Sequence, residues 1–175
     1  MMHSFWSAGM TTLTVSGAIL LAAAGVTHAA RPREHRAVLR AHRLLPAPAF
    51  VAPATAVAEV VVGVSVLAVL LTAPAAATPP VTAQAALYCA FAVYAAVLRR
   101  RRADVPCGCF GAGKVSWAVV SRAVALAAGS AGCVALGPAP DRWPCLAAGL
   151  VLAMANQLVL AWRGATEGKP RGAFR

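Results

Sequence analysis

The chain has 175 residues, of which 60% are hydrophobic and 12% are charged. Soluble globular domains carry about 25% charged residues, so this composition excludes an ordinary soluble protein and indicates a polytopic membrane protein. The net charge of +11 does not indicate a nucleic-acid partner, because the basic residues are confined to the gaps between long apolar runs. We therefore expect an all-α transmembrane helical bundle whose main partner is the lipid bilayer.

Five apolar runs are each long enough to cross a bilayer, which takes about 20 helical residues. They predict spans at about 5–30, 49–71, 81–98, 115–136 and 143–162. A signal peptide is the alternative interpretation of the first run. However, no Lys or Arg precedes that run and Arg31 follows it at once, which favours a retained anchor. Residues 1–163 then form a single membrane domain, and residues 164–175 are expected to form a disordered cytoplasmic tail.

A short amphipathic helix is predicted at residues 31–45, lying on anionic lipid headgroups. Its arginines recur every three or four residues and form one stripe: Arg33, Arg36, Arg40 and Arg43. Histidines recur every seven residues across the same region: His28, His35 and His42. In one continuous helix, neighbours seven apart are separated by about 10 Å, too far to share a metal ion. We interpret these histidines as solvated.

The distribution of Lys and Arg predicts the orientation of the chain. These residues gather after the first span, after the third span and in the C-terminal tail. The N-terminus and the second connection have none, and the fourth connection has only Arg142. Because cytoplasmic segments are enriched in Lys and Arg, we expect a multi-pass plasma-membrane protein with its N-terminus outside and its C-terminus in the cytoplasm.

The motif Cys107-Gly108-Cys109 follows the third span and is the feature with the clearest chemistry. Gly108 between the cysteines, and Gly111 and Gly113 after them, let the backbone bring the two sulfur atoms together. Nearby arginines and Lys114 favour thiolate, the reactive form of cysteine. We predict that Cys107 and Cys109 are a redox pair. An inert pair of small residues in a turn is the alternative, and a zinc site is not predicted, because structural zinc takes four ligands.

Polar residues inside the spans form a second predicted cluster. A carboxylate near the bilayer centre costs roughly 3 kcal/mol, so Glu59 should face the bundle interior. Arg122 and Asn156 lie at similar depth in the cytoplasmic half, and we expect Arg122 to neighbour Glu59 so that pairing offsets the desolvation of both charges. Glu59 then serves either for packing or for handling protons.

The remaining cysteines carry weaker predictions. Cys89 lies in mid-span and is expected to be a buried packing residue. Cys133 and Cys145 flank one short turn at the outer end, where they form a disulfide if their Cα atoms come within about 7 Å.

With these residues in view, the chain resembles the MauE family of methylamine-utilisation membrane proteins, within the wider DoxX-like group. The resemblance runs over about residues 10–135 and depends on the segment 28–46, Glu59, the Cys-Gly-Cys-Phe-Gly motif and Arg122. The family pattern has Lys near position 28 and Asn at position 123, where this chain has His28 and Ala123. The resemblance implies a four-helix core with one extra C-terminal span. It also implies a role in processing, transport or disulfide maturation of the cysteine-rich small subunit of methylamine dehydrogenase.

Three functions follow as hypotheses. The leading one is a thiol–disulfide oxidoreductase acting on a client protein with disulfides, with a thioredoxin-like electron donor and a quinone as a candidate cofactor. The second is a membrane assembly scaffold without catalysis. The third is a small transporter centred on Glu59.

Overall fold

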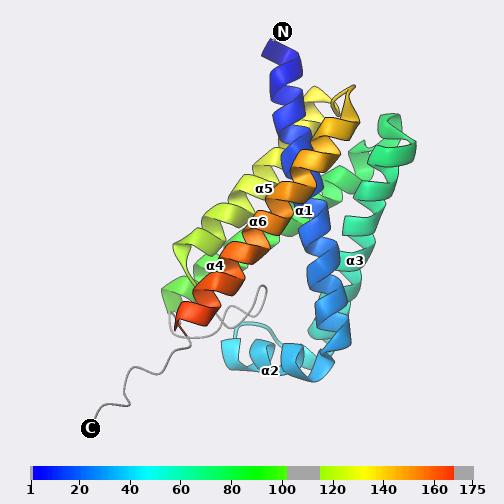
Figure 1. The fold of residues 1–175 in the computed structure, drawn as a ribbon. Coiled ribbons are helices and arrows are strands. Elements are labelled where there is room, and N and C mark those ends of the chain that lie inside the picture. The colour runs from blue at the N-terminus through cyan, green and yellow to red at the C-terminus, as the bar shows by residue number, and fades with distance from the viewer. Residues whose placement is uncertain (1, 102–114, 168–175) are drawn as a thin grey trace.

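The computed structural model describes residues 2–101 and 115–167, and these ranges are almost entirely helical (Figure 1). The elements, in chain order, are α1 (Met2–Ala30), α2 (Pro32–His42), α3 (Pro48–Thr72), the 3-10 turn η1 (Pro74–Ala76), α4 (Thr78–Arg101), α5 (Trp117–Leu136) and α6 (Arg142–Glu167). No strand occurs within the described ranges. The prediction of an all-α bundle is confirmed.

Four of these helices, α1, α3, α4 and α5, are long and apolar enough to cross a membrane. They correspond to the first four predicted spans. The helix at the predicted fifth span, α6, has 26 residues but is not among the helices that meet this criterion within the described part of the chain. A bundle of four apolar spans is therefore established, and a fifth span at α6 stays a prediction.

The helices run up and down, with α1 in the centre of the bundle (Figure 1). One side of α1 contacts α3, another side contacts α5 and α6, and α4 packs mainly against α5. The N-terminus, the α3–α4 connection and the α5–α6 connection lie at one end of the bundle, whereas α2 and the last turns of α4 lie at the other (Figure 1). The arginines of α2 and Arg99–Arg101 therefore share one end, which we call the basic end.

Close packing between α1 and α3 depends on two glycines. A Cβ atom added at Gly25 would lie 2.7 Å from the carbonyl oxygen of Ala56, and one added at Gly63 would lie 2.6 Å from that of Ala18. Small residues at helix contacts let two backbones approach each other within a membrane, where packing rather than the hydrophobic effect drives association. These contacts bring the basic ends of α1 and α3 within side-chain reach of each other.

The predicted short helix is present as α2, and it lies across the basic end of the bundle (Figure 1). The chain leaves α1 through Arg31, whose φ of −126° and ψ of 58° are not helical, and Pro32 then starts α2. The arginines of α2 are exposed, while Leu39 and His42 are buried against the bundle.

Candidate functional site

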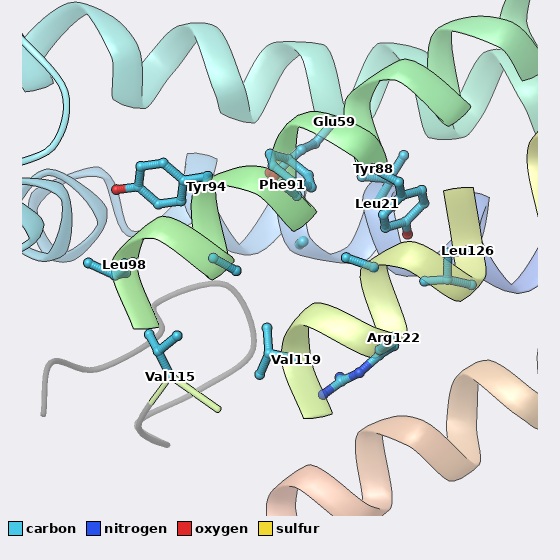
Figure 2. A pocket seen from close by; sticks show the side chains of 13 residues that line it. Leu21, Glu59, Tyr88, Phe91, Tyr94, Leu98, Val115, Val119, Arg122 and Leu126 are labelled. Atoms are coloured by element: carbon cyan, nitrogen blue, oxygen red, sulfur yellow. The ribbon is translucent and has the colours of Figure 1, made fainter. Parts of the chain in front are cut away.

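A small cavity of about 40 Å³ lies near the basic end, between α1, α3, α4 and α5 (Figure 2). Most of its wall is apolar, and four of the residues that line it have polar side chains: Glu59, Tyr88, Tyr94 and Arg122. Leu98 in the last turns of α4 and Val115 just before α5 also line it, so residues 102–114 are joined at both ends to the wall of this cavity.

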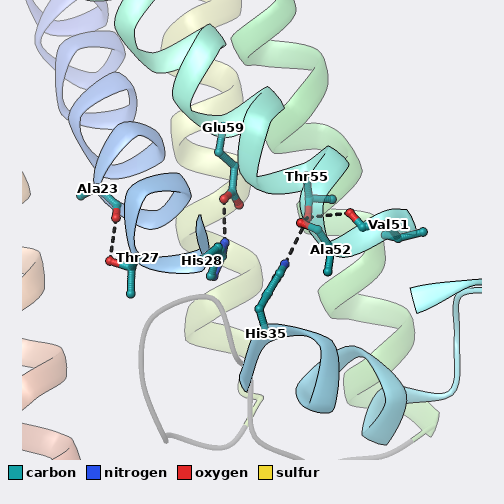
Figure 3. Close-up of polar contacts among 8 residues, drawn as sticks. All are labelled: Ala23, Thr27, His28, His35, Val51, Ala52, Thr55 and Glu59. Atoms are coloured by element: carbon teal, nitrogen blue, oxygen red, sulfur yellow. Dashed lines mark hydrogen bonds and ion pairs between the residues drawn. The ribbon is translucent and has the colours of Figure 1, made fainter. Parts of the chain in front are cut away.

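Glu59 lies at the α3 side of the cavity and pairs with a histidine from α1 (Figure 3). Its Oε2 is 2.7 Å from Nδ1 of His28, and the two side chains are only 4% and 7% exposed. The prediction that Glu59 faces the interior is confirmed. His28 is an ion-pair partner of the carboxylate. Arg122 lines the same cavity from α5, and its pairing with Glu59 stays a prediction.

A second histidine stacks on the first. The rings of His28 and His35 are 12° from parallel with centroids 3.9 Å apart. Nε2 of His35 lies 3.1 Å from Oγ1 of Thr55, whose own hydroxyl proton points to the backbone carbonyls of α3 (Figure 3). The hydroxyl oxygen therefore accepts a hydrogen bond from Nε2–H of His35, which fixes the tautomer of this ring.

The third histidine is also part of the bundle. Nδ1 of His42 is 2.7 Å from the hydroxyl of Tyr94, and His42 is only 1% exposed. The interpretation of these histidines as solvated is wrong: His28 and His42 are buried and His35 is half-buried. It assumed one continuous helix, whereas the break at Arg31 folds α2 back over the bundle and turns all three rings inward.

Burial lowers the pKa of His35 from 6.5 to about 4, with smaller contributions from the nearby His28 and His42. At neutral pH this ring is uncharged, because an isolated positive charge is unfavourable in a partly desolvated position beside two other imidazoles. The contact between α2 and the bundle therefore depends on a neutral His35.

Other predicted residues lie apart from this cavity. Asn156 on α6 does not line it, and its buried Nδ2 makes no hydrogen bond to any residue that the structure describes. Cys133 and Cys145 are buried near the opposite end of the bundle, and both are free thiols. Cys133 lies 3.9 Å from the hydroxyl of Thr11, and Cys145 faces the carbonyl oxygen of Ala8. Each thiol thus packs against α1.

Cys89 is exposed on the outside of the bundle, so the prediction of a buried packing residue is wrong. In α4 the apolar residues surround the whole helix, and the sequence does not reveal which side faces the other helices. Cys107 and Cys109, the predicted redox pair, lie outside the described residues.

A known protein family matches the region of the chain that contains this site. A family model described as methylamine utilisation protein MauE matches residues 7–136. The chain belongs to the MauE family. No match was found among curated proteins or among solved structures.

The MauE match begins in α1 and ends with α5, so it includes every helix that lines the cavity and leaves out α6. Together with the four apolar helices, membership of the MauE family identifies the chain as a multi-pass membrane protein. The resemblance seen in the sequence is therefore confirmed, and the shared region is the bundle that holds Glu59 and His28.

The size of the cavity limits what this MauE-family protein holds there. An apolar cavity of roughly 150 Å³ is needed to take up benzene, whereas a single water needs about 10–15 Å³. A cavity of about 40 Å³ has room for a few waters. Among the described residues, no group of three or more His, Cys, Asp or Glu side chains is arranged to bind a metal ion.

Sequence reasoning missed three members of the site in this MauE-family chain: His28, His42 and Tyr94. A signal was present, because His28 lies near the end of the first apolar run, three residues before the predicted helix, and Tyr94 is one of only two tyrosines in the chain. Their pairing depends on the direction of α2, which no sequence period encodes.

Proposed function

We propose that this MauE-family membrane protein exchanges thiols and disulfides with a cysteine-rich client through Cys107 and Cys109. The observation that carries the proposal is the Cys-Gly-Cys motif within the segment that joins two cavity-lining residues, Leu98 and Val115. Cys109 is six residues from Val115, so an extended chain keeps its thiol within about 20 Å of the cavity wall. The adjacent arginines support the thiolate form.

The exchange uses two steps. The thiolate of one cysteine attacks a client disulfide, forming a mixed disulfide and releasing one client sulfur as a thiolate. The second cysteine then attacks the mixed disulfide and releases the other client sulfur. The client disulfide gains two electrons and two protons, and the Cys107–Cys109 pair becomes a disulfide. A thioredoxin-like dithiol outside the protein returns the pair to its reduced form.

The family description supports a client linked to methylamine utilisation, and we propose the cysteine-rich small subunit of methylamine dehydrogenase. The shared basic end supports an orientation with α2 and the cysteine motif at the cytoplasmic face, the N-terminus outside and the C-terminus inside.

Single substitutions Cys107→Ser and Cys109→Ser test the proposal in cells that produce the client. Each should abolish client maturation while membrane insertion remains normal. One of the two should accumulate a mixed disulfide with the client and the other should not, because the attacking and resolving roles differ. Cys89→Ala is the matched control, since this exposed thiol lies on the outer surface of α4 and should mature the client normally.

The alternative is an assembly scaffold that performs no thiol chemistry. If the Cys107→Ser/Cys109→Ser double variant matures the client at the normal rate, the redox function is wrong and the scaffold function replaces it.

A further inference from the structure

The Glu59–His28 pair has a cavity on one side and the surface helix on the other. Glu59 lines the cavity, and its hydrogen-bond partner His28 lies near the end of α1, just before the chain continues into α2. Beyond His28, the stacked ring of His35 is half-buried and lies beside the exposed arginines of α2. The carboxylate and the imidazole of the pair thus lie between the cavity and the surface helix (Figure 3).

A buried carboxylate and imidazole at 2.7 Å share one proton between their facing atoms. With that proton on Nδ1 of His28 the pair is ionic, and with it on Oε2 of Glu59 both groups are neutral. Either form has no net charge, so the proton can lie at either atom without leaving an unpaired buried charge. Two neutral amides would make an equally good structural contact, whereas this pair can also move a proton from one of its atoms to the other.

The cavity supplies the inner end of a proton route. Its volume of about 40 Å³ holds roughly two or three waters by the usual requirement for a buried water. Most of the wall is apolar, and Glu59 is the member of the pair that lines it. Water in this space would lie against the carboxylate of Glu59.

We propose that Glu59 and His28 are a proton-transfer pair that exchanges protons between the cavity and the basic end of the bundle. The inference rests on the proposed function in one respect, the source of these protons. Each thiol that attacks loses a proton, and each sulfur that leaves gains one. Among the described residues, the other charged or titratable groups around the pair are His35 and His42 on α2, Tyr88 and Tyr94 on α4, and Arg122 on α5.

Infrared difference spectroscopy of the purified protein in lipid nanodiscs tests the pair directly, by following the carbonyl band of a protonated carboxyl group. The chain has three glutamates, Glu34, Glu59 and Glu167. Labelling with ¹³C-glutamate in a Glu34→Gln/Glu167→Gln background leaves Glu59 as the labelled carboxyl, so no substitution at Glu59 itself is needed. We expect its protonated fraction to change at least about fivefold between about pH 5 and about pH 9.

His28→Gln should remove this change, because glutamine keeps a hydrogen bond to the carboxyl group but takes up no proton. His3→Gln is the control, because it makes the same substitution at an exposed histidine near the N-terminus, at the opposite end of the bundle. The carboxyl band of Glu59 in this variant should behave as in the parent. A Glu59 that keeps one protonation state throughout, or that changes equally in His28→Gln, would overturn the proposal, as would an equal loss in His3→Gln.

The same measurement in the Cys107→Ser/Cys109→Ser variant separates this inference from the thiol chemistry. Titration of Glu59 should persist there, because the pair is built from α1 and α3 alone. The result for Glu59 then does not depend on whether the serine variant matures the client. Loss of the titration in the serine variant would contradict the inference that the Glu59–His28 pair works independently of the two cysteines.

Discussion

Acidification should release α2 from the bundle, because His35 must be neutral where it packs. Its pKa falls from 6.5 to about 4 in the folded protein. Above about pH 6.5 the ring is neutral whether α2 is docked or not, and docking is fully stable. As the pH falls toward 4, undocked His35 takes up a proton while docked His35 does not, so the docked state loses stability and the loss is complete below about pH 4.

The size of this effect follows from the shift. One pKa unit corresponds to about 1.4 kcal/mol, so the fall from 6.5 to about 4 has a ceiling of roughly 3.4 kcal/mol. His35 is only half-buried, and solvent screening reduces the usable part to about 1–2 kcal/mol. A free-energy change of this size alters an equilibrium constant by a factor of about 5–30.

Hydrogen exchange of the α2 amides in nanodiscs measures the docking equilibrium, provided that the rates are converted to protection factors at each pH. We expect the protection of residues 32–42 to fall about 5- to 30-fold between about pH 7 and about pH 4. His35→Gln is the control, because its amide can still donate to Thr55 but does not titrate. Constant protection in the parent, or an equal fall in His35→Gln, would refute the reasoning.

Three further predictions concern the bundle. Gly63→Ala should destabilise the fold by about 1–3 kcal/mol in a reversible unfolding assay in detergent, because the new Cβ meets the backbone of Ala18; an unchanged midpoint would contradict the close α1–α3 contact. Gln84→Leu should cost about 1 kcal/mol in the same assay, since Gln84 donates to Thr14 O and Ser130 Oγ and is fully buried; a more stable variant would show that these bonds contribute nothing. A reporter fused after Arg175 should be active only in the cytoplasm, and activity outside would reverse the proposed orientation.

Most of the architecture could be predicted from the sequence because the bilayer imposes it. A helix must satisfy its own backbone hydrogen bonds in lipid, so each long apolar run predicts one spanning helix, and four of the five runs are such helices. The inward-facing side chain of Glu59 could also be predicted, because an isolated carboxylate is unfavourable in lipid and must turn toward the bundle interior.

The partner of Glu59 could not be predicted from depth alone. Depth along the spans selected Arg122, which does line the same cavity, but it gave no information on the rotation of each helix about its axis. His28 pairs with Glu59 where the glycine contacts bring α1 and α3 close together, and depth along each span does not reveal these contacts. Cys89 was misplaced for the same reason, since rotation of an apolar helix leaves its sequence pattern unchanged.

The two glycines of the α1–α3 contact lie one helical turn from the two members of the ion pair. Gly25 is three residues before His28, and Gly63 is four residues after Glu59. Neither glycine bears a functional group, yet each sets the separation at which the acid meets the base. Selection for proton exchange would therefore act on positions that have no chemistry of their own, and a lineage that lost either glycine would have to change the length of the acid or the base as well.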